Sequence, residues 1–168
     1  MAELTNEFLI QTLQEKFGEQ VFDIEVPYGM VTVTTTRESI ISILQALYDD
    51  ETFQFQFLTT MCGMHYPHLP GKELGVVYHL HSLVHNVRLR LKIFFPEDDA
   101  VVPTATNLYQ TANWMERETW DFYGIRFEGH PNLIRILNVE EMEAFPMRKE
   151  FPLEDQTRED KINTFFGR

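Results

Sequence analysis

Apolar residues recur at helical spacing in two segments of the N-terminal third. The first helix is expected to start at Thr5 or Asn6 and to end at Gly18. The second is expected to follow Thr35 and Glu38, which have the spacing of a capping box. The predicted buried stripes are Leu9, Leu13 and Phe17 in the first helix and Ile40, Ile43, Leu44 and Leu47 in the second.

Strand-like alternation dominates the middle of the chain. In segment 53–57 three phenylalanines alternate with glutamines, which predicts a half-buried strand and gives the strongest core signal in the sequence. β-branched residues predict a strand at 31–34. Segments 74–83 and 87–93 are separated by a turn short enough for an antiparallel hairpin. One more strand is expected near 21–26.

The C-terminal half contains one clear helix and little periodic pattern after it. This helix is predicted to run from a cap at Asn113, with Glu116 three residues later, to Gly124. Residues 62–73 are predicted to form a loop because glycine and proline are frequent there. A last short strand is expected at 133–137.

Together these elements predict an α+β fold, with helices packed on one face of a mixed or antiparallel sheet. We place one domain at residues 1–137 and an extended C-terminal arm at residues 138–168. The arm carries aromatic residues at intervals in a charged segment. Because it cannot bury them alone, we expect it to dock on a partner or to be disordered.

The net charge of the chain argues against one class of function and favours another. The 168 residues carry a net charge of −12, and an acidic surface repels phosphates, which argues against nucleic-acid binding. Residues 1–60 hold ten acidic and two basic side chains, whereas residues 112–168 hold twelve and eight. The mixed charge of the C-terminal third is suited to pairing with a partner.

Cysteine content and hydropathy add further exclusions. The one cysteine, Cys62, excludes an internal disulfide and a four-thiolate iron–sulfur cluster held by this chain alone. We expect no membrane-spanning segment, because no apolar run is long enough. We also expect no secretion signal, because the N-terminus is acidic.

The predicted helix at 113–124 is unusual because aromatic and charged side chains occur all around it. We therefore expect it to be buried on several sides, with its charges paired. Arg117 and Asp121 are four residues apart and are predicted to pair within the helix. Glu116 and Glu118 then need partners elsewhere, since an unpaired buried charge is costly.

The sequence around this helix resembles a known family. The letters ERExxDFYGIxFxGHP at residues 116–131 look like the signature of the 30 kDa subunit, or C subunit, of the proton-pumping NADH:quinone oxidoreductase, respiratory complex I. Further similar segments are YHL at 78–80, RLRLK at 88–92, ANW at 112–114, RIL at 135–137 and PMRKEFPL at 146–153. The resemblance covers residues 53–153.

The resemblance implies a non-catalytic subunit of the hydrophilic arm, which supports assembly while NADH reduces quinone and protons are translocated. It implies that this chain holds no cofactor and that FMN, iron–sulfur clusters, NADH and quinone bind elsewhere in the complex. The expected partners are the D and B subunits and other hydrophilic-arm subunits. The expected location is peripheral, on the cytoplasmic side of the bacterial inner membrane.

The resemblance also implies a set of interface residues. The charges of the helix are expected to fix its interface, the following residues to order a turn and strand, and the region near residue 151 to anchor the arm. The residues carried over are Glu116, Arg117, Glu118, Asp121, Gly124, His130, Arg135, Arg148, Lys149 and Phe151.

Two other functions stay open at this point. The same scaffold could serve in a membrane-bound hydrogenase or a ferredoxin-linked complex. From a different class, a free-standing acid–base enzyme could use Glu118 and His130. Helical geometry argues against catalysis by a carboxylate pair, because Glu116 and Glu118 lie about 200° apart around the helix axis.

The predicted hairpin carries two further patterns. Its three histidines could act as zinc ligands. No cysteine or acidic cluster nearby in the sequence would complete the ligand set. These histidines are His79, His81 and His85. Arg88, Arg90 and Lys92 form a basic stripe, which in a chain of net charge −12 suits an acidic partner better than nucleic acid.

Overall fold

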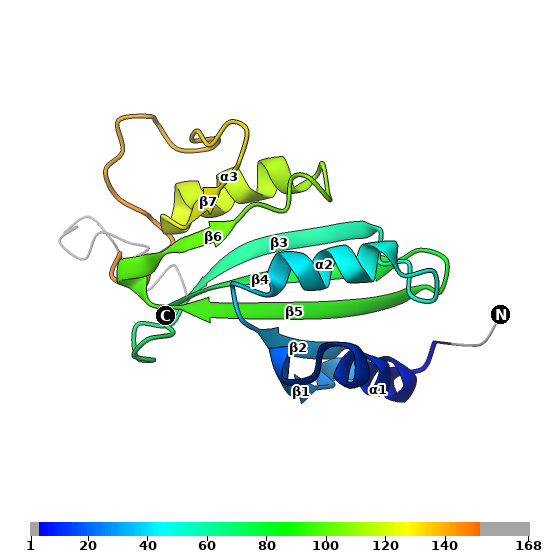
Figure 1. The fold of residues 1–168 in the computed structure, drawn as a ribbon. Coiled ribbons are helices and arrows are strands. Elements are labelled where there is room, and N and C mark those ends of the chain that lie inside the picture. The colour runs from blue at the N-terminus through cyan, green and yellow to red at the C-terminus, as the bar shows by residue number, and fades with distance from the viewer. Residues whose placement is uncertain (1–3, 152–168) are drawn as a thin grey trace, which may run out of the picture.

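A five-stranded mixed sheet forms the centre of the molecule (Figure 1). The computed structural model describes residues 4–151. The strands are β1 (Val21–Glu25), β2 (Val31–Thr35), β3 (Phe57–His65), β4 (Leu74–Ser82) and β5 (Val87–Phe95). They lie in the order β1-β2-β5-β4-β3, in which β2 and β5 run parallel and all other neighbours antiparallel.

Among the described residues, three helices pack on one face of this sheet and none packs on the other, which we call the open face (Figure 1). They are α1 (Asn6–Phe17), α2 (Ile40–Asp49) and α3 (Ala112–Tyr123). Val33, Leu91 and Tyr78 stand side by side on three neighbouring strands of the covered face and are fully buried. The alternate positions of β5 are basic, as in a sheet with one solvated side. The predicted α+β fold is confirmed.

The two N-terminal helices follow the predicted stripes, but only α1 begins as expected. Thr5 caps α1, and its side chain accepts a hydrogen bond from the N–H of Phe8 at 3.3 Å. The capping box of Thr35 and Glu38 is wrong, because Thr35 ends β2 and its hydroxyl donates to the carbonyl of Gln20. Buried stripe residues are Leu9, Leu13, Ile40, Ile43, Leu44 and Leu47.

The predicted strand at 53–57 is also wrong. Phe53 and Phe55 are fully buried, but they reach the core from an irregular connection in which Gln54 has a positive φ of 49°. The third phenylalanine, Phe57, is 41% exposed and begins β3. β3 then takes the first four residues of the predicted loop. A break in register between β3 and β4 obscures its alternation in the sequence.

A second, two-stranded parallel sheet flanks α3. It consists of β6 (Val101–Pro103) and β7 (Arg126–Glu128). The predicted cap at Asn113 is wrong, because α3 already begins at Ala112 and Thr111 before it makes no capping hydrogen bond. Gly124 ends the helix as predicted, with a φ of 74°. The strand expected at 133–137 does not form, because backbone groups of this segment bond to Arg117 and Asp121 of α3 and not to another strand.

The first part of the predicted arm, residues 138–151, contacts the domain. The N–H of Met147 donates to the carbonyl of Phe122 at 3.2 Å, next to the end of α3. Residues 152–168, the rest of the arm, lie outside the described residues. Docking of the arm on a partner therefore stays a prediction.

Candidate interface around helix α3

Glu116 is fully buried in α3 and holds the segment that precedes the helix. Its carboxylate accepts one hydrogen bond from the hydroxyl of Thr104 at 2.5 Å and one from the N–H of Ala105 at 2.7 Å. Burial raises the pKa of Glu116 to about 7, and these two hydrogen bonds offset the rise only in part. Burial and the charge of Glu116 together raise the pKa of Tyr78, whose hydroxyl has no hydrogen-bond partner among the described residues.

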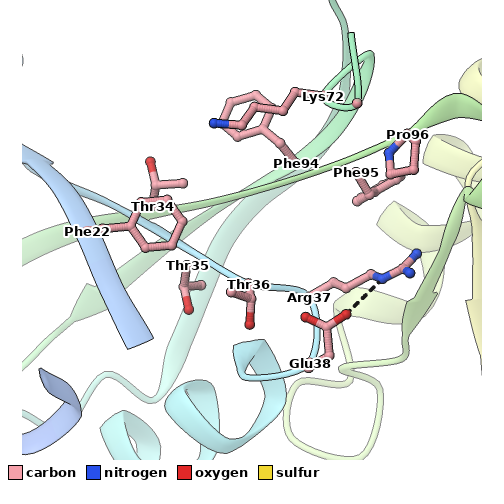
Figure 2. A pocket seen from close by; sticks show the side chains of 11 residues that line it. Phe22, Thr34, Thr35, Thr36, Arg37, Glu38, Lys72, Phe94, Phe95 and Pro96 are labelled. Carbon is pink, nitrogen blue, oxygen red and sulfur yellow. Dashed lines mark hydrogen bonds and ion pairs between the residues drawn. The ribbon is translucent and has the colours of Figure 1, made fainter. Parts of the chain in front are cut away.

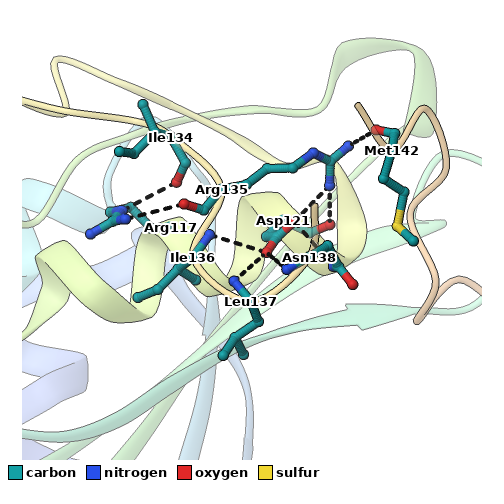
Figure 3. A network of polar contacts seen from close by, with 8 residues as sticks. All are labelled: Arg117, Asp121, Ile134, Arg135, Ile136, Leu137, Asn138 and Met142. Carbon is teal, nitrogen blue, oxygen red and sulfur yellow. Dashed lines mark hydrogen bonds and ion pairs between the residues drawn. The ribbon is translucent and has the colours of Figure 1, made fainter. Parts of the chain in front are cut away.

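Asp121, also fully buried, is the centre of a polar network (Figure 3). Its carboxylate accepts a hydrogen bond from the guanidinium of Arg135 at 2.6 Å. It also accepts from the N–H groups of Ile136, Leu137 and Asn138 at 3.2, 2.9 and 2.9 Å and from the Asn138 side chain at 3.1 Å. Burial opposes ionisation, but these hydrogen bonds outweigh it and hold the pKa of Asp121 well below its usual range.

Arg117 does not pair with Asp121, so the predicted pair within the helix is wrong. Its guanidinium donates to the carbonyls of Ile134 and Arg135, both at 3.1 Å (Figure 3). Arg135 pairs with Asp121 instead and also donates to the carbonyl of Met142. The buried carboxylate gains more from several donors than from one neighbour on the helix, since a pair four residues apart contributes only about 0.2–0.5 kcal/mol.

Two guanidinium groups lie near the ring of Phe145, next to this network. Arg135 lies 5.5 Å from the ring centre of Trp120 and 5.7 Å from that of Phe145. Arg148 lies 5.0 Å from the Phe145 ring and donates to the carbonyl of Tyr123 at 2.8 Å. These contacts join the end of α3 to residues 145–148 by charge and by packing.

The last described residues are tied to the edge of the main sheet. The N–H of Lys149 donates to Nδ1 of His65 at 2.9 Å, and Arg148 pairs with Glu97. The side chain of Lys149 is exposed, and Phe151 is 40% exposed. The Phe151 N–H donates to the carbonyl of Arg148 at 3.1 Å.

Sequence reasoning missed three members of this arrangement. His65 lies far from α3 in sequence and Thr104 is twelve residues before Glu116, and neither carries a motif that would link it to the helix. Phe145 stands out in the sequence only as an apolar residue of the arm. The one usable signal is the charge of Glu116, because a buried carboxylate requires donors from another segment.

Glu118 and His130 do not form an acid–base pair. Glu118 is exposed, whereas Glu116 points into the core, so the two carboxylates do not converge. Nδ1 of His130 accepts from the N–H of Asn132 at 3.0 Å, so Nε2 carries the proton and donates to the carbonyl of Asn113 at 3.1 Å. Both ring nitrogens thus serve to fix the turn after β7.

The rest of the described structure offers fewer features of a binding site. A pocket of about 260 Å³ opens beside Phe22, Thr34 and Lys72 (Figure 2). Its arginine, Arg37, is held by Glu38 at 3.0 Å, and neither a histidine nor a cysteine lines it. Within residues 4–151, no group of three or more His, Cys, Asp or Glu side chains is arranged to hold a metal ion. Among the described helices, none has the length and apolar character needed to cross a membrane.

Comparison with known proteins identifies the family of the chain. The profile of the "Respiratory-chain NADH dehydrogenase, 30 Kd subunit" matches residues 33–157, which include α3 and both of its buried carboxylates. The chain belongs to this family. A similar member is the C subunit of the NADH-quinone oxidoreductase of Rhizobium rhizogenes (strain K84 / ATCC BAA-868), which is 44% identical over 152 residues. The alignment covers 90% of this chain and 74% of that protein.

One solved structure agrees with membership of the 30 kDa subunit family, and a second shares the fold. The trypsin-resistant fragment (1-134) of Nqo5 has a TM-score of 0.63 and 34% identity, covering 74% of this chain and 98% of the fragment. A chain of the membrane-bound sulfane sulfur reductase, an archaeal respiratory membrane complex, has a TM-score of 0.73 and covers 88% of this chain and 85% of its own length. At 24% identity, this second likeness shows the fold alone.

Proposed function

We propose that the chain is the C subunit of a bacterial NADH:quinone oxidoreductase and acts as a scaffold that catalyses no step itself. In this role it supports the D and B subunits, which form the quinone site, together with other hydrophilic-arm subunits. FMN, the iron–sulfur clusters, NADH and quinone bind in those other subunits. The protein is then peripheral, on the cytoplasmic side of the inner membrane.

The observation that carries this proposal is that the charged side chains of α3 bind neighbouring segments of the same chain. Glu116 holds the segment before the helix, and Asp121 with Arg117 holds the segment after it. Every one of these contacts is internal, so the charges order backbone rather than meet a substrate. Glu118 is the exception, since it is exposed.

The ordered segment presents apolar side chains to the surroundings. Leu137 and Val139 are each 64% exposed, and Trp114 on α3 is 58% exposed. Ile134, Met147 and Phe151 add further exposed apolar area. Apolar patches on a protein surface mark interaction sites, and we infer that these side chains form one. The α3 interface is our name for these six residues.

The proposal can be tested with two matched substitutions. Leu137→Asp should prevent co-migration of the tagged full chain with an NADH-oxidising, flavin-containing complex on native electrophoresis of membranes. Leu83→Asp should leave co-migration intact, because Leu83 is 68% exposed at the β4–β5 turn, away from the α3 interface. Both changes affect an exposed leucine, so neither should shift the unfolding midpoint of the purified chain.

Three results would contradict the proposal. The first is co-migration of the unmodified chain with a nickel-containing protein, which would indicate a related hydrogenase complex. The second is flavin bound to the purified chain or oxidation of NADH by it. The third is equal, full assembly of both leucine variants.

A further inference from the structure

The open face of the sheet has a basic centre that the proposed function leaves unused. Arg88, Arg90 and Lys92 occupy alternate positions of β5. They point away from the core, because Leu89 and Leu91 between them are fully buried beneath the helices. This face is therefore opposite to the one that α1, α2 and α3 cover.

A histidine on β4, His79, orients part of this basic centre without adding charge to it. Cross-strand register puts His79 beside Arg90 and His81 beside Arg88. Nε of Arg90 donates to Nε2 of His79 at 2.8 Å, which requires a neutral imidazole and fixes the direction of the guanidinium. Burial and the charges of Arg90 and Arg88 lower the pKa of His79. His81 contacts Asn86 at 3.2 Å.

The three cations lack counter-ions in the part of the chain that the structure describes. None of Arg88, Arg90 and Lys92 forms an ion pair with another of the residues 4–151. By register the acidic residue across the sheet is Glu25 on β1, separated from Arg90 by Thr32 on β2. Two strand spacings amount to about 10 Å, at which exposed charges are largely screened.

We propose that this open face, centred on Arg88, Arg90 and Lys92, docks an acidic helix of a partner protein. Alternate positions on a strand are about 6.6–6.8 Å apart, and residues four apart on a helix rise by about 6 Å. Carboxylates one turn apart on a helix therefore match the spacing of the basic stripe.

The rest of the chain favours a protein over an extended polyanion. A nucleic acid or an anionic bilayer reaches beyond three cations and meets a molecule whose net charge is −12. A single helix needs only the centre of the face. Phe22 and Phe57, which are 37% and 41% exposed on the flanking strands, provide apolar contacts at its margins.

The experiment uses the full tagged chain in native membranes. A photo-crosslinking amino acid replaces His81, which lies on this face beside Arg88. We expect a crosslink to one acidic helical peptide of another protein, identified by mass spectrometry. Arg88→Glu combined with Lys92→Glu should lower its yield at least about tenfold, since a loss of about 1.4 kcal/mol has that effect.

A single charge reversal away from this face serves as the control. Arg126→Glu also reverses an exposed arginine on a strand, but on β7 of the second sheet. It should leave the crosslink yield unchanged. The decisive arm is reciprocal: changing the crosslinked Glu or Asp residues of the partner to Lys should restore crosslinking to the chain that carries the two Glu substitutions.

Several outcomes would overturn the inference. They are a crosslink to lipid, to nucleic acid or to a second copy of this chain, no crosslink at all, or a yield that the reversals do not change. Failure of reciprocal rescue would also overturn it. Co-migration of the unmodified chain with the flavin-containing complex tests the proposed function separately, so the two can fail independently.

Discussion

Glu116 and Asp121 are buried carboxylates on one helix whose pKa values shift in opposite directions. Glu116 has two donors, so burial dominates and raises its pKa to about 7. Asp121 has five hydrogen bonds, including one from Arg135, and these lower its pKa despite burial. The number and charge of the hydrogen-bond donors, and not the depth of burial alone, decide whether the folded state favours the neutral or the ionised carboxyl group.

Asp121→Asn should be among the most destabilising single substitutions in the chain. It leaves the largely buried Arg135 without its counter-ion and replaces one carboxylate oxygen by an NH2 group that cannot accept a hydrogen bond, so we expect a loss of about 3–5 kcal/mol in the free energy of unfolding. Urea unfolding of the purified chain at neutral pH measures this. Glu118→Gln, an exposed change on the same helix, should stay within about 0.5 kcal/mol. Equal midpoints for the two variants would contradict the role of Asp121.

Glu116 predicts a pH dependence of stability with a definite sign. Its folded pKa of about 7 lies above the unfolded value of 4.5, so the folded state holds the proton more tightly. Its contribution to stability is therefore lost as pH rises from about 4.5 to about 7, by up to about 3 kcal/mol. Glu116→Gln cannot ionise, so the variant should gain stability relative to the parent chain as pH rises.

The measurement is the difference in unfolding free energy between this variant and the parent chain from pH 5 to pH 8. Taking the difference cancels the contributions of all ionisable groups that both chains share. Parallel stability curves would show that Glu116 does not titrate in this interval.

At the scale of elements, α3 is fixed by contacts at both of its ends. Its C-terminal end needs Gly124 for two reasons. The residue has a φ of 74°, and a Cβ there would lie 2.6 Å from the ring of Phe145. The left-handed turn ends the helix, and the missing side chain lets residues 145–148 pack across that end.

Gly124→Ala should therefore cost more than backbone strain alone. Gly71 has a φ of 78° and no atom within 4 Å of the position of a Cβ, so Gly71→Ala measures the strain, about 1–2 kcal/mol. We expect Gly124→Ala to lower the unfolding free energy by about 1 kcal/mol or more beyond this. In a Phe145→Ala background the excess should vanish. An unchanged excess in that background would show that the arm does not pack there.

Periodicity predicted those elements whose side chains divide cleanly between core and solvent. The stripes of α1 and α2 and the alternation of β4 and β5 are of this kind. It failed at Phe53 and Phe55, because an irregular segment can also send alternate side chains into a core. It failed at 133–137 because those backbone groups bond to Asp121 and Arg117 rather than to a strand.

At the scale of the whole molecule, the layer arrangement was predictable but the strand order was not. The one-sided distribution of charge on β5 predicts one covered and one open face. The pairing of β2 with β5 depends on contacts between distant segments, and no local pattern encodes it. The family signature in the sequence was enough to locate α3. The hydrogen-bond donors to Glu116 could be identified only from the structure.

The central pairing of β2 with β5 also constrains the order in which the chain can fold while it is being synthesised. β5 begins at Val87 and β2 ends at Thr35, so one edge of β2 waits for its partner while the ribosome adds the intervening residues at about 5–20 per second. During this interval the exposed edge can pair with neighbouring nascent chains on the same messenger. Residues 1–60 hold ten acidic and only two basic side chains. We expect their mutual repulsion to keep the emerging chains apart until β5 arrives.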